Sequence, residues 1–391
     1  MFYNNIMDAF KKLQLQGQLA AYEDDGLPPP QPPACPKVDK TAAMEHHIYQ
    51  AAGRAGQRVP ILKTLLTSVC ERNCYYCACR AGRDFKRITF QPEEMADAVM
   101  RMHQAGSIQG AFLSSGVAGG GLRTQDRILA TAEILRRKLG YRGYIHLKIM
   151  PGAEQAQVEQ AMLLADRVSI NLEAPNSSRL KRLAPMKTLT AELLQPLRWV
   201  DQIRQDQSPH MAWKGRWPSS TTQFVVGGSG ETDLELLQAT QYLTSTLKLA
   251  RTYFSGFTPV ANTPLDHLPP VDPWRRYRLY QASFLLRDYP FNYEELPFDP
   301  SGNLPLDTDP KMAWAKNHLF ETPLDINHAD MLELLRVPGI GPINAKKIIT
   351  ARQRGRLFSI EDLKALGIQT RRAEPFILIN GRRQPVQLSL W

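Results

Sequence analysis

The stretch ILKTLLTSVCERNCYYC, residues 61–77, joins a short apolar run to three closely spaced cysteines. The run ILKTLLT has the length and the apolar content of a buried strand, and it ends just before the first of these cysteines. Five further runs of this kind follow, and helical segments separate them. They are GAFLSS at 110–115, GYIHLKI at 143–149, DRVSINL at 166–172, TTQFVVG at 221–227 and ARTYFSGF at 250–257.

The alternation of six strands with helices predicts an α/β fold, because parallel strands need long crossover connections, which helices provide. Repeated right-handed crossovers curve the sheet into a partial, TIM-like barrel of six β/α units, which are too few to close the usual eight-stranded form. Ligands of such sheets bind where the strands end. The three cysteines therefore lie at the edge where chemistry is expected.

Proline content and helical pattern divide the chain into four expected regions. Residues 1–57 form an N-terminal arm with the proline-rich segment LPPPQPPACP, in which a helix or a central strand is excluded. Residues 58–260 form the barrel, and residues 261–325 form an extension rich in proline and aromatic residues. Residues 326–391 show short helical patterns with glycine turns, which predict a small all-α domain.

The chain of 391 residues has 48 Lys and Arg against 38 Asp and Glu, a formal charge of +10. Residues 327–391 hold eleven basic and five acidic residues, so they carry +6 and the rest carries +4. This balance favours a polyanionic partner, although it also occurs in proteins without one. The sequence has no apolar run of about 18 residues and no signal-peptide pattern, so we expect a cytoplasmic protein without a membrane segment.

Four of the five cysteines fall between residues 70 and 79, which argues against a disulfide framework and for a metal site. Cys70, Cys74 and Cys77 share one loop with the spacing C-x3-C-x2-C. Three thiolates so spaced can bind three irons of a 4Fe-4S cluster and leave the fourth iron open to a non-protein ligand. A zinc site that Cys79 would complete remains the alternative.

Tyr76 precedes the third cysteine, and this C-x3-C-x-aromatic-C loop after the first strand resembles the radical S-adenosylmethionine (SAM) superfamily over residues 60–260. The resemblance implies an enzyme whose 4Fe-4S cluster binds SAM and cleaves it reductively to a 5′-deoxyadenosyl radical. It assigns the catalytic, iron-binding role to Cys70, Cys74 and Cys77. It also implies that Tyr76 packs beside the adenine of SAM.

The same resemblance implies further SAM contacts near the ends of later strands, where the alternative for each residue is an ordinary turn or core position. Lys148 on the third strand is expected to face the cavity and pair with a carboxylate, as is His146 two residues earlier. The other implied contacts belong to the second, fourth and fifth strands: Ser114, Ser115, Gly116, Ser169, Asn171, Glu173, Val226, Gly228 and Glu231.

The segment LLRVPGIGPINAKKII, residues 334–349, resembles a helix-hairpin-helix motif. Its glycine turn would bring backbone N–H groups and the start of a helix against a phosphate. Such contacts address the backbone and not the bases, so binding would be salt-sensitive and independent of sequence. The alternative is a helical cap for protein contacts. The residues expected to contact nucleic acid are Gly339, Ile340, Gly341, Lys346 and Lys347.

Barrel segments such as FLSSGV and FSGFTPV, together with this hairpin, resemble one subfamily described as DNA modification or repair radical SAM proteins. The resemblance implies a flipped or single-stranded DNA nucleotide as target, a flavodoxin- or ferredoxin-type reductant and a uracil-DNA-glycosylase-like partner. It also suggests Cys35 or Cys79 as a hydrogen-donor thiol. Two alternatives stay open: an RNA- or tRNA-modifying radical SAM enzyme, and a non-enzymatic nucleic-acid-binding protein with a structural or redox-sensing metal site.

Overall fold

The computed structural model describes residues 9–16, 48–52 and 57–383. Two features of the expected N-terminal arm, the proline-rich segment and Cys35, lie outside the described residues. The chain divides into two compact units. The first comprises Met1–Glu231 and Tyr242–Arg276, and the second comprises Thr232–Gln241 and Tyr277–Trp391.

The first unit is built on a seven-stranded sheet whose strands lie in chain order. β1 (Ile48–Ala52) pairs antiparallel with β2 (Arg58–Leu65), and each later pair is parallel. The strands that follow β2 are β3 (Gly110–Ser114), β4 (Tyr144–Lys148), β5 (Arg167–Ser169), β6 (Ser219–Val226) and β7 (Arg251–Gly256). The sheet forms the predicted α/β half-barrel, and β1, which the pattern did not predict, covers the edge of β2.

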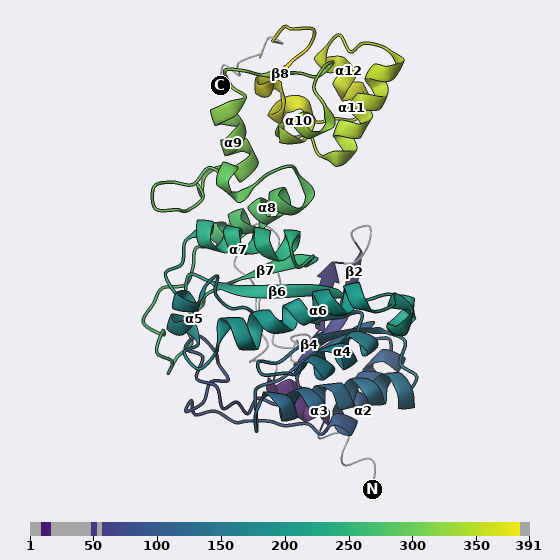
Figure 1. Ribbon diagram of the computed structural model, residues 1–391, viewed down its shortest axis with the longest axis vertical. Helices are drawn as coiled ribbons and strands as arrows, with labels where there is room; N and C mark the ends of the chain where they lie inside the picture. Colours follow the sequence, from purple (N-terminus) through teal and green to yellow (C-terminus); the bar gives the residue numbers. More distant parts are fainter. Residues whose placement is uncertain (1–8, 17–47, 53–56, 384–391) are drawn as a thin grey trace. The chain divides into compact units, whose positions relative to one another are not determined.

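Helices connect the parallel strands. They are α2 (Pro92–Gln104), α3 (Gly121–Glu133), α4 (Gln155–Leu164), α5 (Ser177–Leu183), α6 (Gln195–Asp206) and α7 (Asp233–Ser245). α2, α3, α4 and α6 lie side by side along one face of the sheet (Figure 1). α2 shows why the sequence folds this way: Pro92 has the backbone angle of a first turn, Glu93 and Glu94 favour the positive helix start, and Met95 and Val99 are buried.

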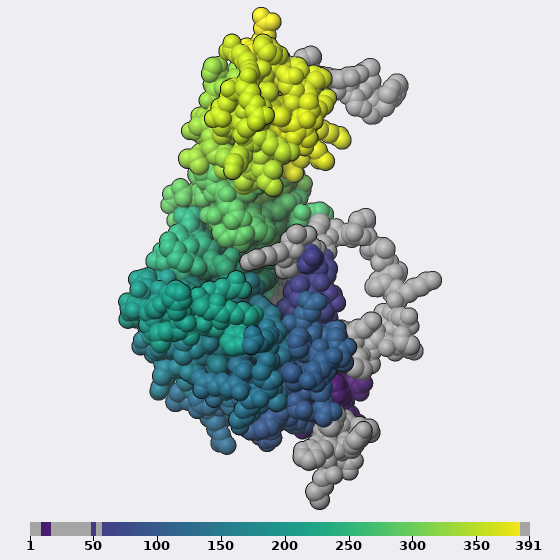
Figure 2. Space-filling model, turned by 90° about the vertical axis from the view of Figure 1, so that its right-hand side faces the viewer, coloured from purple at the N-terminus to yellow at the C-terminus, as the bar shows by residue number. Residues whose placement is uncertain are grey.

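The second unit is helical apart from a parallel pair of two-residue strands, β8 (Leu324–Asp325) and β9 (Ile377–Leu378). Its helices include most of α7 and of α8 (Pro273–Asp288). They are followed by α9 (Pro310–His318), α10 (Met331–Arg336), α11 (Pro342–Arg354) and α12 (Ile360–Ala365). α10 and α11 pack against each other around the turn at 337–341, as a helical hairpin requires. Figure 2 shows the surface of this region in green to yellow. Among the described residues, no helix is long and apolar enough to cross a membrane.

Candidate active site at the carboxyl ends of the strands

A cavity of the first unit lies at the carboxyl ends of the parallel strands, and Cys70, Cys74 and Cys77 all line it. Their loop leaves β2 and is fixed by backbone contacts to other loops. The N–H of Glu71 donates to the carbonyl of Val117 at 2.8 Å, and the N–H of Tyr75 donates to the carbonyl of Leu183 at 2.7 Å. The loop after β3 and the end of α5 therefore hold the cysteine loop against the cavity.

Arg87, which the sequence analysis did not identify, binds the C-terminal part of the cysteine loop. Its guanidinium donates to the carbonyls of Ser68 at 2.8 Å, Cys79 at 3.0 Å, Arg80 at 2.8 Å and Arg83 at 3.1 Å. Four carbonyls from both sides of the cysteines thus converge on one side chain. Because partly buried carbonyl groups need hydrogen-bond donors, these four bonds from Arg87 stabilise the conformation of the loop.

The charged groups next to the cysteines form a buried cluster. The Lys187 ammonium pairs with the Glu173 carboxylate at 2.8 Å, and both side chains are less than a tenth exposed. Burial raises the pKa of the Cys74 thiol to about 12, while the nearby Lys187 ammonium opposes that rise. Burial also raises the pKa of Tyr76 well above its usual value, and the Glu173 carboxylate adds to this effect. A buried thiol of this kind becomes a thiolate when a metal binds it.

The three cysteines are consistent with a 4Fe-4S cluster, in which each thiolate binds its own iron. Backbone N–H groups of Val117 and Cys79 lie 3.4 Å from the sulfurs of Cys70 and Cys77, as is common around cluster thiolates. Cys79 itself is buried at the cavity wall.

Seven of the predicted SAM contacts line this cavity: Tyr76, Ser114, Ser115, Gly116, Lys148, Asn171 and Glu173. Two polar atoms among them, Ser115 Oγ and Glu173 Oε2, are buried and have no hydrogen-bond partner among the described residues. Such atoms are rare in folded proteins, and a bound ligand would satisfy them. A side chain at Gly116 would place its Cβ 2.3 Å from the carbonyl oxygen of Val69, so only glycine fits there.

Ser169, Val226 and Gly228, which were also predicted to contact SAM, do not line the cavity. Ser169 shares the face of Asn171, but its hydroxyl lies 2.8 Å from the ring of His146 deeper in the barrel. Val226 is fully buried, and its neighbour Val225 lines the cavity instead, because successive side chains on a strand point to opposite faces. A Cβ at Gly228 would lie 2.8 Å from the side chain of Leu183, so this glycine serves close packing.

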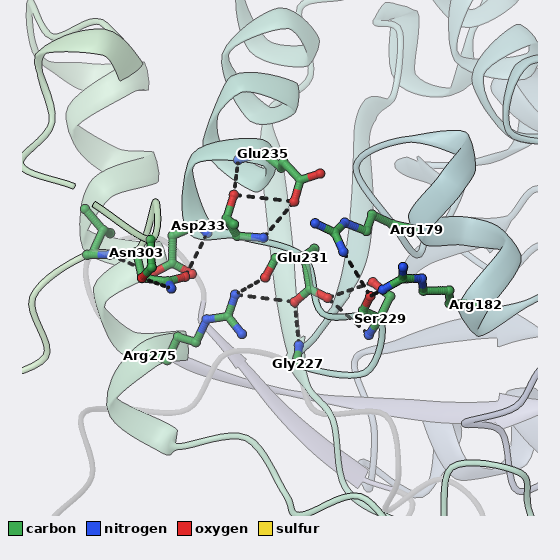
Figure 3. A network of polar contacts seen from close by, with 12 residues as sticks. Arg179, Arg182, Gly227, Ser229, Glu231, Asp233, Glu235, Arg275 and Asn303 are labelled. Atoms are coloured by element: carbon green, nitrogen blue, oxygen red, sulfur yellow. Dashed lines mark hydrogen bonds and ion pairs between the residues drawn. The ribbon is translucent and has the colours of Figure 1, made fainter. Parts of the chain in front are cut away.

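Glu231 lies in the turn after β6 and stabilises that turn (Figure 3). Its carboxylate accepts hydrogen bonds from the N–H of Gly227 at 2.6 Å and from the hydroxyl of Ser229 at 2.7 Å. Arg275 approaches the same carboxylate at 3.5 Å and also donates to the backbone carbonyl of Glu231 at 2.7 Å. The carboxylate is therefore engaged within its own turn, and it is not a lining residue of the cavity.

In the second unit, the hairpin turn has the geometry that its glycines predict. Gly339 has a φ of +84°, which favours glycine, and Gly341 is the N-cap residue of α11. The Ile340 side chain is buried, so only its backbone is accessible to a ligand. Lys346 and Lys347 are exposed on α11, and Lys347 donates to the carbonyl at the end of α12 at 2.8 Å.

A half-barrel with a cysteine loop at the carboxyl ends of its strands defines the general class of the first unit. The family model described as "Radical SAM superfamily" matches residues 64–243, and the one described as "Helix-hairpin-helix motif" matches residues 320–368. The chain therefore contains a radical SAM superfamily domain followed by a helix-hairpin-helix motif. Both predictions from the sequence are confirmed at this level.

Solved structures with similar folds include methylornithine synthase, with 14% identity, a TM-score of 0.46 and 58% of this chain covered. A radical SAM methyltransferase from Sphaerobacter thermophilus has 14% identity and a TM-score of 0.43, with 70% of this chain and 85% of that chain covered. The FeFe-hydrogenase maturase HydG from Carboxydothermus hydrogenoformans has 14% identity and a TM-score of 0.44, with 58% of this chain covered. The match spans 61% of the synthase and 51% of this maturase. No curated protein matches the sequence.

Proposed function

We propose that the protein is a radical SAM enzyme that acts on DNA. The observation that carries the enzymatic part is the convergence of three cysteines and several strand-end polar residues on one cavity of a radical SAM domain. When bound, the cluster would supply the electron for reductive cleavage of SAM. Cys70, Cys74 and Cys77 would hold it, in a loop that the segment after β3 and the end of α5 keep in place.

The chain's own residues then orient SAM. Ser115 Oγ and Glu173 Oε2 offer an unsatisfied donor and acceptor to its polar groups. Lys187 pairs with one oxygen of the Glu173 carboxylate and holds this side chain in place, so that its other oxygen can accept a hydrogen bond from the amino group of SAM. Because Tyr76 lines the same cavity, its ring can pack against the adenine.

The DNA part of the proposal rests on the hairpin turn and on the charge of +6 over residues 327–391. A turn of this type binds a phosphate through backbone N–H groups, and nearby lysines add a salt-dependent attraction. The barrel cavity can receive only a flipped or unpaired nucleotide. A cytoplasmic location, a flavodoxin- or ferredoxin-type reductant and a uracil-DNA-glycosylase-like partner belong to the same proposal.

Anaerobic reconstitution tests the enzymatic part. We expect about four irons per chain and the formation of 5′-deoxyadenosine from SAM and dithionite. Cys74→Ala should lose both the iron and the product. Cys79→Ala is the matched control, because this neighbouring buried cysteine is outside the predicted ligand set, and it should keep the iron. A chain that binds one zinc and produces no 5′-deoxyadenosine would contradict the proposal.

RNA is the second candidate substrate, because the hairpin addresses phosphates that both polymers carry. Mass spectrometry of nucleosides from a deletion strain and its parent separates the two candidates. A difference in DNA nucleosides supports the proposal, and a difference confined to RNA nucleosides would replace DNA by RNA.

A further inference from the structure

The barrel interior contains a second charged cluster that the cysteine chemistry does not explain. Lys63 on β2 and Lys148 on β4 both line the cavity, and each is only 7% exposed. Their strands flank β3, and both ammonium groups lie over the ring of Phe112. Lys63 Nζ is 5.9 Å from the ring centroid, and Lys148 Nζ is 5.4 Å from it.

The strand register explains why the two ammonium groups converge. Lys63 pairs with Phe112, and Phe112 pairs with His146, so these three side chains form one row across the sheet. The rings of Phe112 and His146 stack at 4.0 Å. Lys148 lies two residues beyond His146 on the same face of β4 and donates to Asn171 Oδ1 at 2.6 Å. The Phe112 ring thus lies beside both ammonium groups.

The charged groups that shift the pKa of His146, beside the two lysines, differ from those that shift the pKa of Cys74. Burial lowers the pKa of His146 well below its usual value, and Arg167, Lys148 and Lys63 lower it further. The groups that act on Cys74 are a different set, led by Lys187. The cavity therefore has two groups of charged side chains: Lys187 and Glu173 beside the cysteines, and Lys63 and Lys148 beside Phe112.

We propose that Lys63 and Lys148 form an oxyanion subsite for the phosphate of the nucleotide substrate. Two ammonium groups can donate to different oxygens of one phosphate, and their attraction is strong where water is largely excluded. The subsite rests on the proposed function for its choice of phosphate as the anion.

The test is isothermal titration calorimetry of the full, reconstituted chain with thymidine 5′-monophosphate, with thymidine and with acetate. We expect the monophosphate to bind at least about tenfold more tightly than thymidine, since hydrogen bonds between charged groups are worth more than one factor of ten. Lys63→Met and Lys148→Met should each remove this advantage. Lys63→Arg should keep most of it, and so should Lys138→Met, the matched control for an exposed lysine after α3.

Three results would overturn the subsite. In the first, the monophosphate binds no more tightly than thymidine, and in the second, its tighter binding persists in both Lys63→Met and Lys148→Met. The third result is that acetate binds as tightly as the monophosphate. A fourth result would also overturn the subsite: if SAM displaces the monophosphate, the two lysines bind the carboxylate of SAM instead. Far-UV circular dichroism shows whether each variant is folded. Formation of 5′-deoxyadenosine by the wild-type chain is measured separately, so failure of the subsite can be told from failure of the proposed function.

Discussion

At the scale of single residues, the candidate site depends on a few side chains whose importance is not visible in the sequence. Cys70, Cys74 and Cys77 were predictable because their spacing carries the chemistry. Arg87 was not, because its role arises from four carbonyls that only the folded loop brings together. Lys63 was not predicted either, because it lies within an apolar run that indicated only a buried strand.

Arg87 gives a test of the loop that is independent of catalysis. Arg87→Met removes four hydrogen bonds from a charged donor, so we expect the free energy of unfolding to fall by about 3 kcal/mol. We also expect fewer irons per chain after reconstitution, because the cysteines lose their common support. Chemical denaturation and iron analysis measure both effects.

Arg137→Met is the control for this variant, because Arg137 is exposed and forms only a long ion pair at 3.9 Å. It should change neither stability nor iron content by a measurable amount. Equal iron loading in wild type and Arg87→Met would show that the loop does not need Arg87.

At the scale of elements, the strands and helices followed from periodicity, but the ends of strands did not. The six parallel strands were predicted, whereas β1 was missed because it falls in a region expected to be an arm. At the end of β6 the resemblance pointed to Val226, yet Gln223 and Val225 line the cavity. A shift of one residue moves a side chain to the other face, so motif matching cannot fix which residue faces the site.

The hairpin turn gives an element-scale prediction for DNA binding. Gly339→Val forces a branched residue into a φ of +84° and against Arg372, so the turn must change shape. We expect DNA affinity to fall at least about tenfold, because phosphate contacts need preorganised N–H groups. Fluorescence anisotropy at several salt concentrations measures this loss.

Gly381→Val is the matched control, since Gly381 has a similar φ of +74° but open space around its Cβ position. It imposes the same backbone strain in the same unit without touching the hairpin. If both variants bind DNA like the wild type, the hairpin turn is not the binding site.

Lys311 on α9 gives the second unit a pH-dependent stability. Its ammonium donates to the carbonyl of Ile340 in the hairpin turn at 2.7 Å, and burial lowers the pKa of Lys311 to about 7, with Arg372 adding to this shift. An unfolded lysine titrates near about 10.4. Between these values the unfolded state binds more protons, so stability should increase as pH rises from about 7 to 10.

Replacing Lys311 with Met removes the titrating group, and the variant's Tm should therefore rise less across this range than that of the wild type. Lys316→Met, an exposed lysine on the same helix, should retain the wild-type slope. Thermal unfolding followed by circular dichroism provides the comparison, and parallel curves for wild type and Lys311→Met would refute the assignment.

At the scale of the whole molecule, one chain combines a radical SAM domain with a helix-hairpin-helix motif. The opening stretch at residues 61–77 and the turn at 339–341 were enough to predict both, because each motif is local in sequence. The composition of the cavity was less predictable, since its walls come from six strands and their loops. Its lysine-lined region could be identified only once the strand register placed Lys63 and Lys148 beside one ring.

The central claim is that a DNA nucleotide reacts in the barrel cavity. The most direct measurement is the mass of the 5′-deoxyadenosine formed by the reconstituted chain with SAM, dithionite and fully deuterated DNA. We predict that deuterium appears in the product with DNA and not with deuterated RNA. Product that carries no deuterium from DNA, or that takes deuterium only from RNA, would contradict the claim.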